Sequence, residues 1–168
     1  TRIDLFAVIL SPEDSVFQTA LSEKVRVFRV GGASRAETVR NGVSTLLEQG
    51  LAEAQDNILV HDAARCCLPA EALTRLLDEA EESNEGGILA IPVADTLKRA
   101  AGSHLIDETV ARAGLWQAQT PQLFQTALLN RALSVDDLSE ITDEASAVEK
   151  LGIRPRLVEG DTRYFILT

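Results

Sequence analysis

The chain has 168 residues, of which 45% are hydrophobic and 25% are charged, a balance typical of one ordinary globular domain. Its formal net charge of -10 and the lack of a long basic run argue against a nucleic-acid groove and against binding to an anionic membrane surface. No apolar run reaches the ~20 residues of a membrane helix. No signal peptide is recognisable, so we expect a cytoplasmic protein.

Strand-like and helix-like segments alternate through the first two-thirds of the chain. Short apolar runs predict buried strands, and apolar residues at helical spacing predict helices. The expected strands cover residues 5–10, 25–30, 57–61, 86–93, 156–158 and 164–167. A first helix is expected to begin at Ser11, with Val16, Ala20 and Leu21 on its buried face. Four further helices are expected at residues 34–49, 69–82, 125–132 and 142–151, and Thr142 is the expected N-cap of the last one. This alternation predicts an α/β fold with helices on both faces of a mostly parallel sheet.

Residues 94–124 break this alternation. They are strand-like, irregular and polar, so we expect extended chain outside the main sheet. Two strands of one arm could carry Thr96 and Arg112, which would supply a hydroxyl and a charged fork to a phosphate, although a solvated hairpin is the alternative. Residues 116–122 combine polar side chains with a proline, which favours a binding loop.

Ligands of parallel α/β sheets bind beyond the carboxyl ends of the strands, so candidate site residues should follow strands directly. The run GGASRAET at residues 31–38 follows one expected strand and opens a helix. Its glycines allow close backbone approach, and the first helical amides are free donors. An ordinary strand-to-helix turn is the alternative, because the spacing matches no standard phosphate-binding motif.

The run HDAAR at residues 61–65 follows the next expected strand. Asp62 could hold Mg²⁺ beside substrate phosphates, and the small Ala63 and Ala64 would let a flat base or sugar lie against the backbone. Arg65 could pair with Asp62 or with an anion. The alternative is a capped turn with a structural ion pair, and we expect His61 to be a hydrogen-bonding side chain and not a catalyst.

Few side chains suit nucleophilic or acid–base catalysis. The chain has two histidines and two cysteines, and the adjacent Cys66 and Cys67 lack both a disulfide framework and a CxxC metal spacing. We interpret the cysteines as small, partly buried side chains, with a reactive thiol as the minor alternative. Any chemistry should therefore depend on charge stabilisation and positioning.

Five blocks in a fixed order resemble one family, the 2-C-methyl-D-erythritol 4-phosphate cytidylyltransferases. Each block is weak singly, but the five in order form a specific signal over nearly the whole chain. The blocks are GGxxRxx(S/T)V at residues 31–39, HDAAR at 61–65, PVxDTxK at 92–98, RxGLWxxxTPQ at 112–122 and ITDEAS at 141–146.

The resemblance implies a Rossmann-like, three-layer nucleotidyltransferase fold spanning residues 1–168, with residues 94–120 as a β-arm that interlocks two subunits of a homodimer. It implies that CTP reacts with methylerythritol phosphate in non-mevalonate isoprenoid synthesis. The acceptor phosphate attacks the α-phosphorus of CTP in line and pyrophosphate leaves, so orientation and charge neutralisation carry the catalysis.

The resemblance also implies roles for individual residues. Asp62 and Arg112 would be catalytic, with Asp62 serving Mg²⁺ and the phosphates. The acceptor phosphate would be held by Thr96, Arg112 and Thr120, with Thr96 and Arg112 reaching in from the partner subunit. The nucleotide would be contacted by Gly32, Ala33, Arg35, Thr38, Ala63 and Arg65.

Two departures from the family pattern stand out. The family opens with a strand and a glycine-rich loop that supplies an Arg and a Lys to the transition state, and we expect about fifty such residues, a length taken from the family, to be missing here. The family's final helix also looks absent. In addition, alignment of the last strand places Ile166 where the family has a Lys that positions the acceptor phosphate, and an aliphatic side chain cannot replace an ammonium group.

Two other functions stay open at this point. A related alditol-phosphate cytidylyltransferase, for example one using ribitol 5-phosphate, would share the nucleotide chemistry. A non-catalytic homologue is favoured by the absent loop and by Ile166.

Overall fold

The computed structural model describes residues 2–18, 22–102 and 104–164. Four strands form the main sheet, in the order β3 (Asn57–Val60), β7 (Trp116–Gln125), β4 (Gly87–Pro92) and β8 (Arg156–Glu159). β8 runs parallel to β4, and β7 runs antiparallel to both β3 and β4. The strands β3, β4 and β8 therefore share one direction, and β7 alone opposes them.

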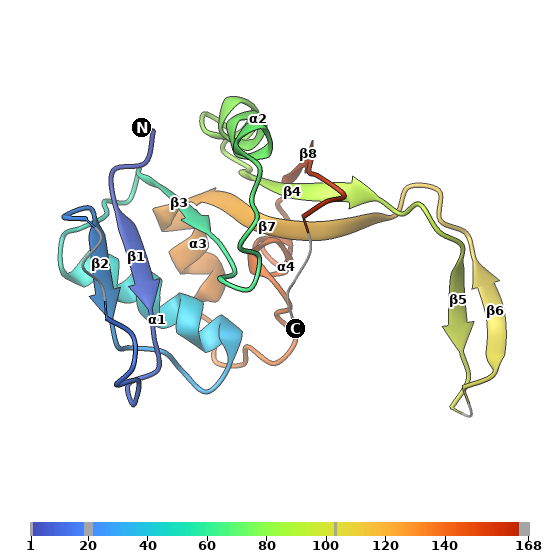
Figure 1. Ribbon diagram of the computed structural model, residues 1–168, viewed down its shortest axis with the longest axis horizontal. Coiled ribbons are helices and arrows are strands. Elements are labelled where there is room, and N and C mark those ends of the chain that lie inside the picture. Colours follow the sequence, from blue (N-terminus) through green and yellow to red (C-terminus); the bar gives the residue numbers. More distant parts are fainter. Residues whose placement is uncertain (1, 19–21, 103, 165–168) are drawn as a thin grey trace.

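Helices cover both faces of this sheet, as Figure 1 shows. Helix α2 (Ala70–Ala80) packs on one face against Leu89, Leu123 and Val158. Three helices pack on the other face against Ile88, Ala90 and Phe124: α1 (Arg35–Glu48), α3 (Thr126–Leu133) and α4 (Glu144–Glu149). Adjacent apolar residues of one strand point to opposite faces, so the continuous apolar runs predicted a sheet buried on both sides. The three-layer α/β prediction is confirmed.

The first two strands form a separate small sheet. β1 (Phe6–Ile9) pairs in parallel with β2 (Val25–Phe28). α1 packs against β1 as well as against α3, so this helix joins the two sheets.

The helix expected after Ser11 does not form in residues 11–18, which make turns and bends instead. The Asp14 carboxylate accepts a hydrogen bond from the Phe17 amide at 2.9 Å. Such side-chain bonds to nearby amides compete with helical hydrogen bonds. Val16, expected on the apolar face, is 84% exposed, whereas Ala20 and Leu21 lie outside the described residues.

Residues 94–124 are only partly an excursion. A hairpin of β5 (Leu97–Ala100) and β6 (Ile106–Val110) does project away from the body (Figure 1). β7, however, returns to the centre of the main sheet, so the expected binding loop at residues 116–122 is wrong. The polar residues of this segment suggested a loop, but Gln119 and Gln122 are buried and their side-chain amides form hydrogen bonds inside the protein.

Smaller differences concern the last third of the chain. α4 begins at Glu144 with Asp143 as its N-cap, one residue later than the expected cap Thr142. Tyr164 lies outside any strand and is buried, and the rest of the strand expected there, including Ile166, lies outside the described residues.

Candidate functional site

A tight turn leads from β2 into α1 and is closed by the side chains of the helix itself. The Gly32 amide donates to Thr38 Oγ1 at 3.0 Å, and the Ala33 amide donates to Glu37 Oε2 at 2.7 Å. Ser34 is the N-cap and accepts from the Glu37 amide at 3.2 Å. A Cβ on Gly32 would lie 2.4 Å from the Glu37 Cβ, so the turn itself requires this glycine.

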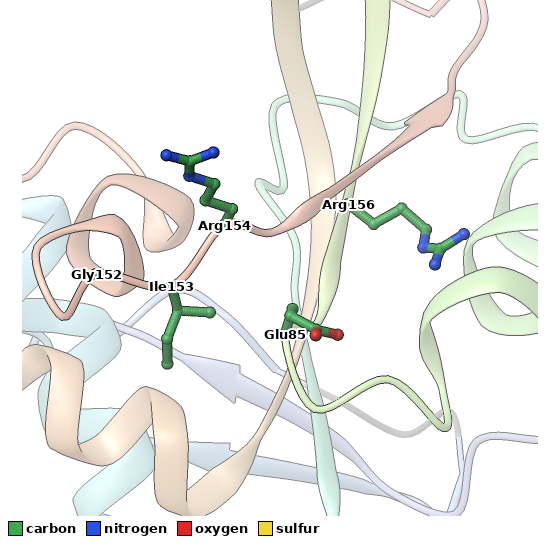
Figure 2. A pocket seen from close by; sticks show the side chains of 5 residues that line it. All are labelled: Glu85, Gly152, Ile153, Arg154 and Arg156. Atoms are coloured by element: carbon green, nitrogen blue, oxygen red, sulfur yellow. The ribbon is translucent and has the colours of Figure 1, made fainter.

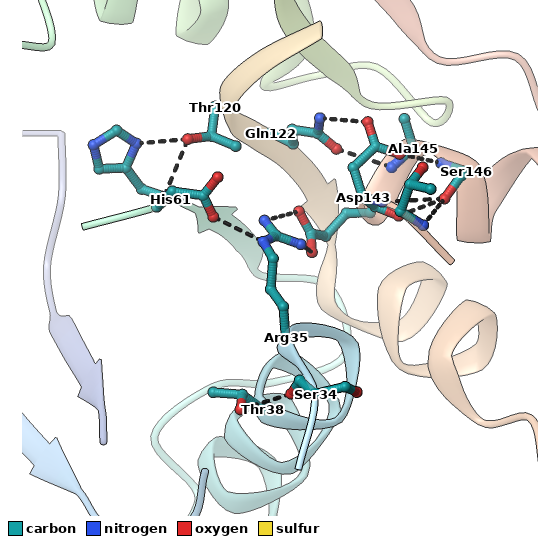
Figure 3. Close-up of polar contacts among 12 residues, drawn as sticks. Ser34, Arg35, Thr38, His61, Thr120, Gln122, Asp143, Ala145 and Ser146 are labelled. Carbon is teal, nitrogen blue, oxygen red and sulfur yellow. Dashed lines mark hydrogen bonds and ion pairs between the residues drawn. The ribbon is translucent and has the colours of Figure 1, made fainter. Parts of the chain in front are cut away.

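Arg35, the first residue of α1, bridges two carboxylates from distant parts of the chain. Its Nη1 and Nη2 lie 2.7 and 3.1 Å from the two oxygens of Glu144, and its Nε lies 2.8 Å from Asp62 Oδ1 (Figure 3). Burial by itself lowers the pKa of the guanidinium, but the hydrogen bonds and charges of Glu144 and Asp62 outweigh burial and raise that pKa. The arginine is therefore held as a permanent cation between them.

Asp62 follows β3, and its backbone is fixed by the neighbouring strand β7. The Asp62 amide donates to Thr120 Oγ1 at 3.1 Å, and Thr120 is buried. The Arg65 amide donates to the Asp62 carbonyl at 2.9 Å, which closes a turn. The Arg65 side chain does not pair with Asp62, one of the two partners considered for it, and Arg35 binds Asp62 Oδ1 instead.

His61 is a hydrogen-bonding side chain, as the sequence predicted. Its Nε2 lies 3.0 Å from the Arg65 carbonyl, which can only accept, so Nε2 carries the proton. In the neutral ring Nδ1 then accepts from Thr120 Oγ1 at 3.1 Å. Desolvation lowers the pKa of His61, which favours this neutral form.

Tyr164 was not anticipated from the sequence. Its hydroxyl donates to the Thr120 carbonyl at 2.6 Å, and its ring stacks on His61 with a centroid distance of 6.1 Å. The Arg65 guanidinium carbon lies 5.7 Å from the Tyr164 ring centroid, in a cation–π arrangement. Among the described residues, the buried Arg65 Nε has no hydrogen-bond partner. In the sequence, Tyr164 is a single aromatic residue after a polar segment, and no motif there indicates that it would contact Thr120, His61 and Arg65.

A second network unnoticed in the sequence joins β7 to α4. Gln122 donates from Nε2 to Asp143 Oδ2 at 2.9 Å and accepts from the Ala145 amide through Oε1 at 2.9 Å. Ser146 and Asp143 complete a reciprocal capping box (Figure 3). These bonds fix the start of α4 and thereby the position of Glu144, which is 1% exposed.

The structure gathers one part of the predicted site and leaves another part away from it. The turn at Gly32, the bridging Arg35, Asp62 and Thr120 meet at the carboxyl end of β3, with Ala63 and Arg65 on the same loop. Thr96 and Arg112 instead lie at the base of the projecting β5–β6 hairpin, where both are exposed.

A hollow of about 590 Å³ lies elsewhere, lined by Glu85, Gly152, Ile153, Arg154 and Arg156 (Figure 2). Arg156 pairs in register with Gly87, so this hollow lies at the amino ends of β4 and β8. Ligands of α/β sheets bind beyond the opposite ends of the strands. The hollow is therefore not the candidate site.

The candidate site could supply only some of the ligands that a metal ion needs. No cluster of three or more His, Cys, Asp or Glu side chains that could hold a metal ion occurs among residues 2–18, 22–102 and 104–164. Mg²⁺ commonly takes one or two carboxylates and fills its other positions with water and substrate phosphates. Asp62, whose Oδ1 is bound by Arg35, fits that mode.

Comparison with known proteins decides the family. The sequence model of the 2-C-methyl-D-erythritol 4-phosphate cytidylyltransferase family, IspD, matches residues 1–168. The chain belongs to this family. It is 64% identical over 169 residues to the 2-C-methyl-D-erythritol 4-phosphate cytidylyltransferase of Neisseria gonorrhoeae strain NCCP11945, covering 99% of this chain and 73% of that protein. It is 49% identical to the protein of the same name from Laribacter hongkongensis, covering 99% of this chain and 72% of that protein.

Solved structures of cytidylyltransferases share the fold. A crystal structure of 4-diphosphocytidyl-2C-methyl-D-erythritol synthase superposes with a TM-score of 0.90 at 63% identity, covering 98% of this chain and 77% of that one. The Francisella tularensis cytidylyltransferase superposes with a TM-score of 0.83 at 30% identity, covering 98% of this chain and 75% of that one. The expected Rossmann-like nucleotidyltransferase fold is confirmed. Within the described residues, no helix combines the length and apolar character needed to span a membrane.

Proposed function

We infer that this cytidylyltransferase moves the cytidylyl group of CTP onto 2-C-methyl-D-erythritol 4-phosphate and releases pyrophosphate, a step of non-mevalonate isoprenoid biosynthesis. The observation that carries this function is the family match over residues 1–168 with 64% identity to a relative of that name. The alternatives of a ribitol-phosphate enzyme and of a non-catalytic homologue are not favoured by it.

We propose that the turn at Gly32, Ala33 and Thr38 forms one wall of the nucleotide site. Hydrogen bonds from the Gly32 and Ala33 amides to α1 side chains support this role, because they hold the turn rigid beside the carboxyl end of β3. Ala63 and Arg65 would lie against the nucleotide from the neighbouring loop. The unpartnered Arg65 Nε supports an anionic ligand there.

Arg35 takes a different part in the proposal from the direct nucleotide contact first expected. Its guanidinium forms ion pairs with Glu144 and Asp62, so we propose that its main role is to orient the Asp62 carboxylate. Any contact with the nucleotide would involve only the part of the Arg35 side chain that is exposed to solvent. Thr120 accepts a hydrogen bond from the Asp62 amide and donates its hydroxyl proton to His61, so its proposed contact with the acceptor phosphate would require it to release His61.

We propose that Asp62 binds Mg²⁺ together with the CTP phosphates. Mg²⁺ would neutralise the charge that develops on the phosphates. Residues of the chain itself position the Asp62 carboxylate. Arg35 donates a hydrogen bond to its Oδ1, and Thr120 of β7 accepts a hydrogen bond from the Asp62 backbone amide. Positioning of this kind matches a reaction in which orientation supplies much of the rate.

We further propose a homodimer in which residues 94–120 form an arm that carries Arg112 and Thr96 to the site of the partner subunit. Both residues are exposed and flank the β5–β6 hairpin at its base. Near the hairpin tip, Leu105 and Ile106 are 68% and 66% exposed. Exposed apolar side chains on a projecting hairpin support burial against another chain.

The function is tested by measuring pyrophosphate release by the intact gene product. CTP, Mg²⁺ and 2-C-methyl-D-erythritol 4-phosphate should give release, whereas ribitol 5-phosphate in place of the acceptor should give little. Absence of release with the first acceptor would overturn the function, and equal release with the second would favour the alditol-phosphate alternative.

Asp62→Asn tests the proposed metal role. It keeps the side-chain size but removes the charge, so kcat should fall roughly 10- to 100-fold, the range of a lost charge-assisted interaction. Raising the Mg²⁺ concentration should recover part of the rate. A variant with wild-type kcat and wild-type Mg²⁺ dependence would remove Asp62 from the proposed metal site.

A further inference from the structure

The loop between β3 and α2 carries two adjacent thiols, Cys66 and Cys67. The prediction that these side chains are partly buried is wrong, because both are free and exposed. Their sulfur atoms lie 3.8 Å apart. These are the two cysteines of the whole sequence, so any thiol chemistry of this chain takes place here.

Their separation suits chelation of one soft ion. Two sulfurs bound to one centre at about 2.3 Å lie roughly 3 to 4 Å apart, close to the separation found here, so both could reach one centre with little movement of the loop. Thiolates select soft, thiophilic ions over hard ones. The described residues offer no group of three or more metal-binding side chains, so the protein would supply two sulfurs and the bound species would keep its own third substituent.

We propose that Cys66 and Cys67 form a bidentate site for trivalent arsenic compounds that carry two exchangeable oxygen ligands. The reaction is a condensation without a redox change. Two arsenic–sulfur bonds form and two arsenic–oxygen bonds break, and each thiol proton leaves with one hydroxyl group as a molecule of water. The hydrogen bond and charge of Cys66 raise the pKa of Cys67, which agrees with two thiols that share their environment.

The dithiol is coupled to the candidate site through a short turn. The Arg65 amide donates to the Asp62 carbonyl at 2.9 Å, and the Arg65 carbonyl accepts from His61 Nε2 at 3.0 Å. Cys66 follows Arg65 directly. A bulky arsenical bridging both sulfurs would therefore restrain the turn that positions Asp62 and Arg65. This consequence rests on the proposed function, whereas the binding itself does not.

The test uses phenylarsine oxide on the whole chain, with intact mass and free-thiol titration as readouts. One phenylarsenic group should bind per chain and remove both thiols. It should survive excess glutathione, a monothiol, and leave with dithiothreitol, a dithiol. Cys66→Ser and Cys67→Ser each keep one thiol and a similar shape, so their adducts should be lost in glutathione.

The outcomes separate binding from its consequence. A wild-type adduct as glutathione-sensitive as the single-cysteine adducts would overturn the site, as would a Cys67→Ser adduct as stable as the wild type. Circular dichroism of both variants checks that they fold. Bound arsenical should lower the pyrophosphate release of the wild type at least fivefold and leave Cys67→Ser unaffected in glutathione. A stable adduct with full activity would overturn the coupling to the turn.

Discussion

Arg35 and Glu144 form a two-pronged ion pair across 109 residues of sequence, with nitrogen–oxygen distances of 2.7 and 3.1 Å. Arg35 is 37% exposed at its side chain, whereas that of Glu144 is 1% exposed. The same guanidinium also binds Asp62. Two carboxylates on one cation leave one net negative charge, which is available to a cation bound at Asp62.

Removal of the arginine should therefore be costly. Arg35→Met would leave the Glu144 carboxylate buried and unpaired, and we expect a loss of about 2–4 kcal/mol in the free energy of unfolding. Urea denaturation measures it. The control is Arg99→Met, which breaks the Arg99–Glu108 pair of the hairpin at 2.6 Å, where both side chains are more than half exposed. That change should cost at most about 1 kcal/mol, and equal losses in the two variants would contradict the bridging role.

Gly32→Ala should disturb the proposed nucleotide wall. The new Cβ would lie 2.4 Å from the Glu37 Cβ, so the turn must shift, and we expect a loss of about 1–3 kcal/mol in stability with a raised KM for CTP. Gly102→Ala is the matched control, because a Cβ there meets nothing within 4 Å. Thermal melting and CTP titration of both variants check the prediction. An unchanged KM for CTP in Gly32→Ala would place the nucleotide elsewhere.

Arg112→Ala should weaken use of the acceptor much more than binding of CTP. A charged hydrogen bond contributes about 1.5–3 kcal/mol, and more when desolvated, so the acceptor KM should rise or kcat fall by roughly 10- to 1,000-fold. Arg99→Ala removes another arginine from the same hairpin and should leave these constants near wild type. Steady-state kinetics with each substrate varied in turn separates the two effects. Unchanged acceptor kinetics in Arg112→Ala would exclude this residue from the site.

The His61 network should make stability depend on pH. Desolvation lowers the pKa of His61 in the folded protein below its ordinary value of 6.5, so the unfolded chain binds a proton more readily than the folded one. The stabilisation from the neutral ring is therefore complete above about pH 6.5 and is lost as the pH falls through and below that value. Melting temperatures from pH 8 to pH 5 should fall more steeply for the wild type than for His61→Gln. Parallel curves would contradict this assignment.

Several features of the site follow from local sequence. The Gly32 turn and the Ser34 cap lie where a strand meets a helix, and Asp62 follows a short apolar strand. Local hydrogen bonding and the alternation of strands with helices decide such positions, because parallel strands bring their carboxyl ends to one edge. The ordered blocks from residue 31 to residue 146 also pointed to the family.

What the sequence by itself determined is thus the order of most elements, the two buried faces of the sheet and the positions of its polar turns, since periodicity and capping act over a few residues. Only the tertiary structure decided that β7 enters the sheet and that Arg35 pairs with Glu144. It also decided that Tyr164 forms a hydrogen bond with Thr120 and stacks on His61. These contacts join residues 44 to 109 positions apart. The partner that satisfies a buried polar group is selected by the packing of whole elements, and no local pattern encodes that choice.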